Sequence, residues 1–306
     1  MERLVAIVGP TATGKSELAL HMARSFGGEI VGADSRQVYR FMNIGTSKPT
    51  SDQMASVPHH LIDVVNPDED FNLATYCQSA PEVIKTIQQR ERLPLLVGGS
   101  GLYVWSVIEG WKMPGVPPDP ELRLKLENKA RQEGSHVLYQ ELQGIDPVAA
   151  SKIHPANIRR IIRALEIHRV MGKSPSSLGH KEAPSFPIII IGLTMERDEL
   201  YRRIDARVDN MIREGLVKEV EGLLEMGYSL ALPSMSGIGY RQVGTFLQGR
   251  VGLPEAIDRI KYETHRLVRH QYAWFRLNDK RVHWLDANQP SASFNEAKNI
   301  MEGFLL

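Results

Sequence analysis

The sequence predicts an α/β fold, in which a parallel sheet carries helices on both faces and an all-helical domain is inserted into the chain. Apolar runs alternate with helical patterns over residues 4–97, the order that a parallel sheet requires. A segment with four prolines in eight residues, 113–120, interrupts this alternation. Helical patterns then continue to about residue 171, and an apolar run at 188–193 returns to the sheet. We therefore assign 1–112 and 188–306 to an α/β core with C-terminal helices, and 113–187 to a helical insertion domain.

The first predicted strand, 4–8, runs into a glycine-containing loop, and a helical pattern follows at 17–23. The loop has the spacing G-x-x-x-x-G-K-[ST], which is specific when it lies between a strand and a helix. Backbone N–H groups of such a loop cradle a diphosphate, the lysine supplies positive charge, and the hydroxyl can ligate Mg²⁺. A turn that binds nothing is the alternative. The sequence thus predicts a P-loop NTPase-like core with a nucleotide- or diphosphate-binding loop formed by Gly9, Pro10, Thr11, Ala12, Thr13, Gly14, Lys15 and Ser16.

Two further strands are predicted at 29–33 and 94–97, with a helix at 73–89 between them. The first of these strands ends at the turn 34–39, and the second at the turn 98–103. Ligands of parallel sheets bind beyond the carboxyl ends of the strands, so both turns are expected to lie beside the P-loop. A last strand at 282–285 and a final helix at 295–305 complete the predicted core.

The composition restricts the class of protein. The chain has 306 residues, of which 42% are hydrophobic and 24% charged, as in soluble globular proteins. Cys77, the single cysteine, excludes an internal disulfide and a cysteine-built metal site. No run reaches membrane-spanning length, and the early first strand leaves no room for a signal peptide, so we expect a cytoplasmic protein without a membrane partner. With a net charge of +1, nucleic-acid binding would depend on local basic patches.

Three predicted helices carry basic residues in a repeated pattern. An ordinary solvated face explains one such helix, whereas three in a near-neutral chain favour a surface for phosphate backbones. In the helix at 255–276, we expect a buried face formed by Ala256, Ile260, Leu267, Gln271 and Trp274. The opposite face carries Arg259, Tyr262, Arg266, Arg269 and Arg276. The other two helices are 156–170, with Arg159, Arg160 and Arg163, and 121–133, with Arg123, Lys125, Lys129 and Arg131.

Two charged residues are candidates for chemistry. Asp34 follows the second predicted strand, where a carboxylate can help to hold Mg²⁺, act as a general base or simply cap a helix. Arg207 lies at the margin of the apolar stripe formed by Leu200, Ile204, Val208 and Met211. An arginine there can neutralise a departing diphosphate or form a boundary salt bridge.

An acidic residue is missing where P-loop hydrolases have one. These enzymes place an aspartate at the end of an apolar strand to help hold Mg²⁺. The strand at 94–97 ends instead in Gly98 and Gly99. The bound diphosphate is therefore predicted to be a leaving group or a donor, and not part of a hydrolysed cofactor.

The chain resembles the bacterial tRNA isopentenyltransferase family from about residue 3 to residue 286. The resemblance rests on the P-loop at 9–16 and on six further motifs in the family's order. These are Asp34-Ser35-Arg36-Gln37-Val38-Tyr39, Ile44-Gly45-Thr46-Ser47-Lys48-Pro49, Gly98 to Tyr103, Arg163-Ala164-Leu165-Glu166, Gly237-Ile238-Gly239-Tyr240-Arg241-Gln242 and Arg269-His270-Gln271-Tyr272-Ala273-Trp274-Phe275-Arg276.

This resemblance implies transfer of a dimethylallyl group from dimethylallyl diphosphate to N6 of the adenosine 3′ to the anticodon, position 37, in tRNAs that read codons beginning with U. It implies Mg²⁺ as cofactor, the tRNA anticodon stem-loop as partner, and a monomer. The catalytic residues would be Asp34 as general base, Ser16 as the metal ligand, and Arg207 on the diphosphate. Residues matching the family's tRNA contacts are Asp34, Ser35, Arg36, Gln37, Ser100, Arg123, Arg159, Arg160, Ile161, Ile162, Arg163, Gly239, Tyr240, Arg241 and Gln242. The family often has methionine where Arg36 stands and threonine where Ser100 stands, which leaves the expected reaction unchanged.

Two other activities fit parts of the sequence. An isopentenyltransferase that modifies free adenine nucleotides would share the P-loop and Asp34. A P-loop small-molecule kinase would share the P-loop and an acid after the second strand. The basic helices outside the core favour tRNA, because a free nucleotide needs no such surface.

Overall fold

The computed structural model describes residues 2–178 and 180–306, so that Met1 and Gly179 lie outside the described residues. Contacts between Cα atoms divide the chain into a larger unit, residues 2–108 and 184–306, and a smaller unit, 109–183. The boundaries differ by four residues from those that the sequence suggested. Residues 109–112 belong to the smaller unit, where Trp111–Lys112 (β5) pairs antiparallel with His180–Lys181 (β6), and residues 184–187 belong to the larger unit. This ladder was not predicted from the sequence, since two-residue strands leave no periodicity to detect.

The larger unit is built on a sheet whose six described strands are all parallel, in the order β3-β2-β4-β1-β7-β8. The five longer strands expected from the apolar runs are present, together with a short one at 59–60 that was not expected. Every residue of β1 is buried, as continuous apolar runs require when both faces of a sheet are covered. The strands are β1 (Leu4–Val8), β2 (Gly28–Gly32), β3 (His59–His60), β4 (Leu93–Gly98), β7 (Ile188–Thr194) and β8 (Val282–Asp286).

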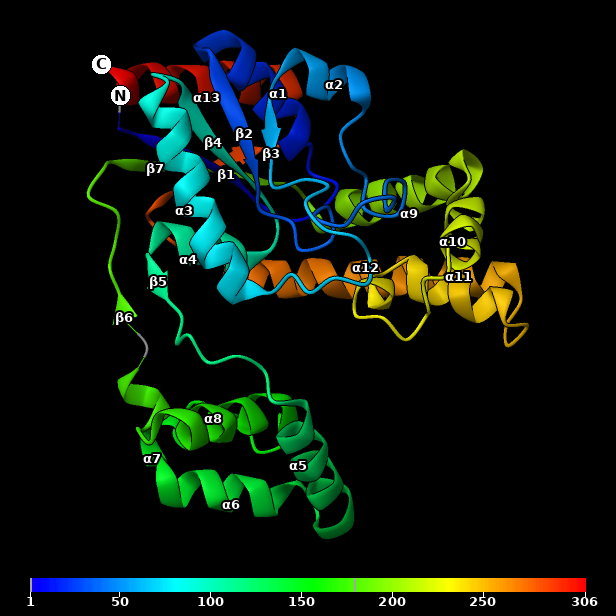
Figure 1. Ribbon diagram of the computed structural model, residues 1–306. Coiled ribbons are helices and arrows are strands. Elements are labelled where there is room, and N and C mark those ends of the chain that lie inside the picture. The colour runs from blue at the N-terminus through cyan, green and yellow to red at the C-terminus, as the bar shows by residue number, and fades with distance from the viewer. Residues whose placement is uncertain (1, 179) are drawn as a thin grey trace. The chain divides into compact units, whose positions relative to one another are not determined.

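Helices cover both faces of this sheet (Figure 1). Helices α1 (Lys15–Phe26) and α13 (Pro290–Leu305) pack together on one face, and α3 (Leu73–Gln89) and α4 (Gly101–Ile108) pack together on the other. The helix α3 has the predicted bounds, whereas α13 begins five residues before its predicted start because Pro290 is accepted in the first turn. The short helix α2 (Ser51–Ser56) lies between β2 and β3.

Four helices after β7 extend the larger unit beyond the carboxyl ends of the strands (Figure 1). Their buried residues join those of the sheet in one hydrophobic cluster, which includes Leu200, Ile204, Val220 and Ile260. The four helices are therefore part of the same core and form a wall that faces the sheet edge at which the P-loop lies. These helices are α9 (Arg197–Glu214), α10 (Leu216–Glu225), α11 (Tyr240–Leu247) and α12 (Leu253–Trp274).

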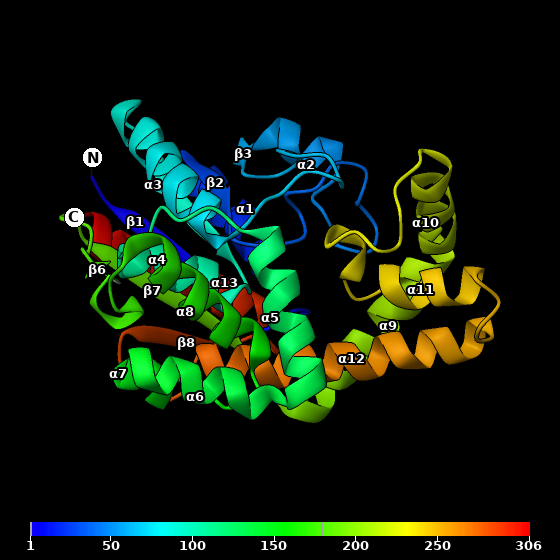
Figure 2. The same cartoon turned by 60° about the horizontal axis from the view of Figure 1, so that its bottom comes forward.

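The smaller unit is helical, as expected, and has its own hydrophobic cluster around Leu138, Leu142, Ile161 and Leu165. Helices α5, α6 and α8 pack against one another in pairs, and α7 packs against α6 (Figure 2). Each long helix starts at a side-chain cap or at a glycine, with Asp119 capping α5 and Asn157 capping α8. The helices are α5 (Pro120–Glu133), α6 (Ser135–Ile145), α7 (Pro147–Ser151) and α8 (Ile158–Met171).

Candidate active site

The P-loop adopts the conformation that its glycines permit. Gly9 has a φ of +136°, and a Cβ there would lie 2.4 Å from the Leu193 carbonyl oxygen of β7. The loop closes on itself through hydrogen bonds to the Pro10 carbonyl, from Thr13 Oγ1 at 2.9 Å and from Lys15 Nζ at 2.5 Å. Helix α1 begins at Lys15 without a side-chain cap, so the first N–H groups of the helix are available to an anion.

Positive charge accumulates at this loop. Burial, followed by the nearby charge of Arg207, lowers the pKa of Lys15 to about 7, while Asp34 acts in the opposite direction. Burial also lowers the pKa of Arg207, again opposed by the charge of Asp34. A bound diphosphate would relieve the repulsion between the two side chains and favour the charged form of Lys15.

Asp34 lies directly beyond β2, where its carboxylate closes a turn. Its Oδ1 accepts hydrogen bonds from the backbone N–H of Arg36 at 2.8 Å and of Gln37 at 3.3 Å. No helix starts at Asp34, so the helix-cap alternative does not apply. Its Oδ2 has no hydrogen-bond partner in the part of the chain that the structure describes, which leaves this oxygen available for a proton.

The turn after β2 is tied to the turn after β4. The backbone N–H of Ser35 donates to Ser100 Oγ at 3.1 Å, and the N–H of Ser100 donates to the Ala33 carbonyl at 3.2 Å. The P-loop, the Asp34 turn and the Gly98 turn thus lie together at one edge of the sheet, as the sequence predicted.

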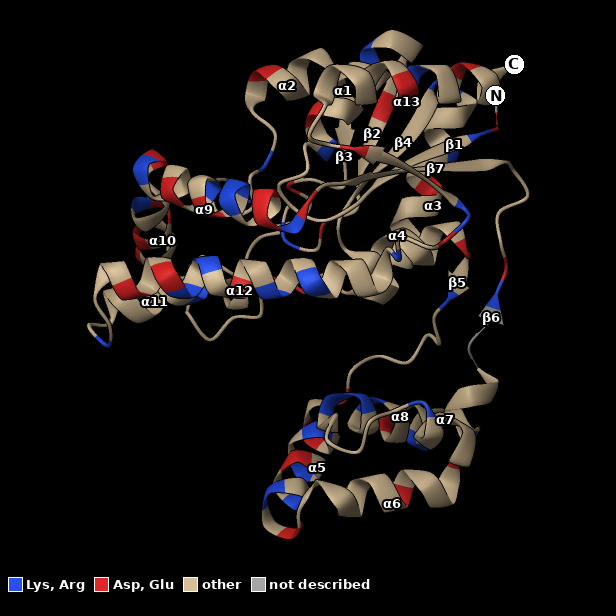
Figure 3. Cartoon of the chain, turned by 180° about the vertical axis from the view of Figure 1, so that it is seen from behind, with Lys and Arg blue, Asp and Glu red and all other residues tan. Residues whose placement is uncertain are grey.

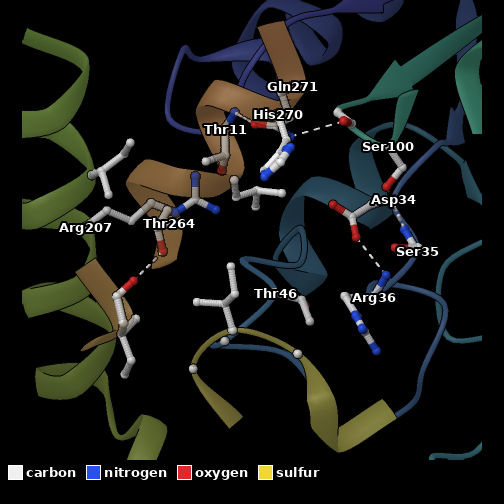
Figure 4. Close-up of a pocket in the computed structure, with 18 of the residues that line it drawn as sticks. Thr11, Asp34, Ser35, Arg36, Thr46, Ser100, Arg207, Thr264, His270 and Gln271 are labelled. Atoms are coloured by element: carbon white, nitrogen blue, oxygen red, sulfur yellow. Dashed lines mark hydrogen bonds between the residues drawn. The ribbon is translucent and has the colours of Figure 1, made fainter. Parts of the chain in front are cut away.

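Two cavities of the larger unit meet at this edge. The first, the P-loop cavity, has a volume of about 600 Å³ and is lined by residues of the loop and by Arg203. The second, the apolar cavity, has a volume of about 440 Å³, and its wall includes Ile204, Val208 and Ile260. The residues that line both cavities are Thr11, Asp34, Thr46, Gly99, Arg207, Met211 and Gln271. Figure 4 shows Asp34 and Arg207 on either side of the apolar cavity. A ligand in each cavity would therefore meet the other beside Asp34 and Arg207.

The helix α9 presents two arginines toward the P-loop cavity, and they differ in their partners. Arg203 donates from Nε to Glu199 Oε1 at 3.1 Å, one turn earlier on the same helix. Arg207 has no hydrogen-bond or ion-pair partner among residues 2–178 and 180–306. The boundary salt bridge considered for Arg207 is therefore not formed, and this guanidinium is free to bind a diphosphate.

The helix α12 corrects one expectation. Leu267 and Trp274 were expected to pack in the core, but they line the apolar cavity and are 39% and 41% exposed, whereas Ile260 is buried as expected. Gln271 is 7% exposed, as expected for the buried face. The periodicity identified the apolar side of the helix correctly, but a ligand cavity covers part of this side.

The motif residues 35–37 and 237–242 are mostly held by internal contacts. Arg36 donates to the Pro233 and Ser234 carbonyls, and Gln37 Nε2 donates to the Thr46 carbonyl. Tyr240 is 1% and Gln242 5% exposed, so their side chains make contacts within the protein, and the tRNA contacts expected at these positions stay a prediction. Tyr240 donates to Glu219, and Gln242 Oε1 accepts from the Gly239 N–H. Arg241 is exposed and lies 3.8 Å from Glu263.

A loop that sequence reasoning did not place in the site also lines it. Thr46 borders both cavities, and the preceding backbone N–H groups of residues 43–45 all donate to the Glu219 carboxylate. The sequence signal for this loop was the motif 44–49. Its glycine, Gly45, packs so closely against Tyr240 that a Cβ at this position would lie 2.5 Å from the ring.

In the smaller unit, the expected tRNA contacts divide into three groups. Ile161 and Ile162 are 0% and 3% exposed and their side chains pack in the core of the unit, while the tRNA contact expected at these positions stays a prediction. Arg123 and Arg163 bind Glu166, whose side chain is fully buried. Arg159 and Arg160 are exposed, and their side chains have no partner among the described residues.

The donor set for a metal ion is small. No cluster of three His, Cys, Asp or Glu side chains that could hold a metal is found in the described parts of the chain. The exposed Ser16 hydroxyl at the start of α1 fits a Mg²⁺ ion whose other ligands are phosphate oxygens and water, because Mg²⁺ is commonly held in this way at P-loops.

Known proteins resemble this chain over most of its length. The family model described as IPP transferase matches residues 37–278, and the one described as isopentenyl transferase matches residues 2–66. Among curated proteins, the tRNA dimethylallyltransferase of Thermomicrobium roseum is 51% identical over 94% of this chain and 87% of its own length. That of Roseiflexus castenholzii is 54% identical over 89% of each chain.

Two solved structures extend the comparison. The tRNA isopentenylpyrophosphate transferase of Bacillus halodurans superposes with a TM-score of 0.68 at 41% identity, covering 99% of this chain and all of the other. A eukaryotic dimethylallyltransferase acting on tRNA superposes with a TM-score of 0.79 at 26% identity, covering 94% of this chain and 74% of the other.

Proposed function

From the membership of this chain in the IPP transferase family we propose its substrates and mechanism. The relatives that it matches are tRNA dimethylallyltransferases, so the chain is a prenyltransferase. The enzyme transfers a dimethylallyl group from dimethylallyl diphosphate to N6 of adenosine 37 in tRNAs that read codons beginning with U, and releases diphosphate. The observation that carries the proposal is the free Oδ2 of Asp34 at the wall shared by the two cavities.

On the donor side, the diphosphate binds in the P-loop cavity. The uncapped start of α1 and Lys15 hold its oxygens, and Arg207 stabilises the charge that develops as the C–O bond breaks. Mg²⁺, held by Ser16 and the diphosphate, would neutralise part of the same charge. The dimethylallyl group extends into the apolar cavity, where Ile204, Val208 and Met211 exclude water from the reacting carbon.

On the acceptor side, the adenine enters the apolar cavity from the surface of the larger unit. The exocyclic amine is a poor nucleophile because its lone pair is delocalised into the ring. Asp34 Oδ2 takes a proton from this amine as the C–N bond forms, while Oδ1 stays fixed by two backbone N–H groups. The base leaves its stack in the anticodon loop to reach the cavity, as it does in other base-modifying enzymes.

The exposed arginines are the proposed contacts to the tRNA backbone. Figure 3 shows basic residues along α12 in the larger unit and on α5 and α8 in the smaller unit. Arg266 of α12 and Arg159 and Arg160 of α8 have side chains without partners among the described residues, so their charge is available to phosphates.

We further propose that the enzyme acts in the cytoplasm as a monomer. In the described residues, no helix combines the length and the apolar character needed to cross a membrane.

The reaction is tested by incubating the enzyme with labelled dimethylallyl diphosphate and either tRNA or AMP. We expect the label in tRNA alone, at adenosine 37. Label in AMP would support the free-nucleotide activity, and no label in either acceptor would refute prenyl transfer as proposed here.

A second test concerns ATP. The turn after β4 reads Gly98-Gly99-Ser100 and has no carboxylate, so we expect no cleavage of ATP. Incubation of the enzyme with γ-labelled ATP, Mg²⁺ and tRNA should give no labelled phosphate or phosphorylated product above the blank. Under the same conditions dimethylallyl diphosphate should be consumed in proportion to the tRNA modified. Labelled phosphorylated product would support the kinase interpretation.

A third test concerns the basic face of α12. Replacing Arg266 and Arg269 together by Gln should weaken tRNA binding and lower the slope of log affinity against log salt by about 0.7–0.9 per lost phosphate contact. Dimethylallyl diphosphate binding should be unchanged, since neither residue lines the P-loop cavity. Arg259→Gln is the matched control, because Arg259 is paired with Glu255 at 2.5 Å on the same helix. An unchanged slope in the double variant would exclude the contact.

A further inference from the structure

Gln271 connects two loops that the mechanism uses, although no role has been assigned to it so far. It projects from α12, is 7% exposed, and lines both cavities. Its Oε1 accepts from the Thr11 backbone N–H at 2.9 Å, and its Nε2 donates to the Gly99 carbonyl at 3.1 Å. Figure 4 shows this side chain close to Thr11. The amide therefore joins the first half of the P-loop to the turn after β4.

The contact is built into the fold. A Cβ at Gly99 would lie 2.4 Å from Gln271 Nε2, so a larger residue there would displace the amide from its present position. A Cβ at Gly101 would lie 2.3 Å from Trp274 Cγ, three residues further along α12. Trp105 Nε1 also donates to the Trp274 carbonyl at 3.1 Å. Helix α12 therefore contacts residues 98–101 at Gln271 and, about one turn later, at Trp274.

The Gln271 amide contacts the part of the P-loop that lies away from the proposed diphosphate position. The diphosphate is cradled by the second half of the P-loop and by the start of α1, which Gln271 does not touch. Thr11, in the first half, lines both cavities, and the proposed reaction brings the donor's reacting carbon and the amine together where these cavities join. Fixing Thr11 against Gly99 therefore sets the shape of the passage between the two substrates.

We propose that Gln271 is a positioning residue that holds Thr11 and Gly99 so that the reacting carbon of the donor faces the amine beside Asp34. The inference rests on the proposed prenyl transfer. A misplacement of about 1 Å in such a passage costs about 10²-fold in rate, whereas substrate binding to the outer surfaces is unaffected.

The first experiment uses Gln271→Met, which keeps the length of the side chain but can neither accept from Thr11 nor donate to Gly99. We expect kcat to fall about 10–100-fold. The KM values for dimethylallyl diphosphate and for tRNA should each stay within about threefold, because both hydrogen bonds of the amide are made to the protein backbone. Tyr272→Phe is the matched control: it removes a hydrogen bond of 2.9 Å to Thr194 from the adjacent position of α12, and should leave kcat unchanged.

The second experiment uses Gln271→Glu and varies the pH. A glutamate keeps an acceptor for Thr11 but places a second acceptor against the Gly99 carbonyl. When protonated, it again offers one acceptor and one donor, like glutamine. The rate of this variant divided by the wild-type rate should therefore rise as the pH falls from 8 to 5. The other titratable groups that line the two cavities are the same in both proteins, so the ratio removes their own titration. They are Lys15, Glu17, Asp34, Arg36, Lys48, His59, Tyr103, Arg203, Arg207, Glu214 and His270.

The outcomes separate the possibilities. A loss of kcat in Gln271→Met, with recovery of Gln271→Glu at low pH, supports the proposal. An unchanged kcat in Gln271→Met overturns it. A parallel rise of both KM values with a lower melting temperature, or a pH-independent ratio, shows a role in packing alone and also overturns it. If the wild-type enzyme does not modify tRNA in the same assay, the proposed function fails instead.

Discussion

Replacing Asp34 by Asn is expected to lower kcat for dimethylallyl transfer by roughly 10²–10⁴-fold, the usual contribution of a general base. The amide of asparagine retains an oxygen for the N–H groups of Arg36 and Gln37, so the turn after β2 should keep its shape. It cannot take a proton from the adenine amine. Single-turnover measurement of tRNA modification, with both substrates saturating, reports this step directly.

Two controls make the result specific. Asp34→Ala removes the turn contacts as well as the base, so a further loss relative to Asn measures the contribution of the turn. Ser35→Ala alters the neighbouring side chain but keeps the backbone N–H that donates to Ser100 Oγ. Binding of dimethylallyl diphosphate should be close to wild type in all three variants. A single-turnover rate near wild type in Asp34→Asn would refute the assignment of the base.

The parts of the site that follow from local sequence were predictable. The P-loop conformation depends on glycines at fixed positions between a strand and a helix, and these are visible in the sequence. The gathering of Asp34 and Gly98 beside the loop follows from the rule that parallel strands end at one edge. The contacts of Gln271 and Glu219 were not predictable, because each joins segments more than 170 residues apart.

Periodicity also has a limit as a guide to burial. It identified the apolar side of α12 but could not show that Leu267 and Trp274 border a cavity and not other side chains. Similarly, the arginines of α5 and α8 give the same pattern whether they are free or paired. Only the fold shows that Arg123 and Arg163 are bound to Glu166, whereas Arg159 and Arg160 are free among the described residues.

This pairing makes Glu166 important for the stability of the smaller unit. Its carboxylate is fully buried and accepts from Arg123 at 2.9 Å on each oxygen, from Arg163, and from the Asp119 N–H at 2.7 Å. Burial alone would raise the pKa of this carboxyl. The hydrogen bonds from Arg123, Asp119 and Arg163 outweigh burial and lower the pKa to about 2.

Replacing Glu166 by Gln is expected to destabilise the smaller unit by about 3–5 kcal/mol, because both arginines lose their carboxylate and one amide cannot accept all four hydrogen bonds. The free energy of unfolding can be followed by hydrogen exchange of the α5 and α8 amides in increasing urea, which separates this unit from the larger one. Glu141→Gln, at the surface pair with Lys129, is the matched control and should leave the urea midpoint nearly unchanged.

The same residue predicts how stability depends on pH. The carboxyl has an ordinary pKa of 4.5 when unfolded and about 2 when folded, so the unfolded state binds the proton more readily. The stabilisation is therefore complete above pH 4.5 and is lost as the pH falls toward 2. In wild type, exchange of the α5 and α8 amides should accelerate over this range, whereas in Glu166→Gln the acceleration should be smaller because no proton is taken up at this position. Equal acid sensitivity in the two proteins would show that other carboxylates, and not the one that joins α5 to α8, determine the acid unfolding of the unit.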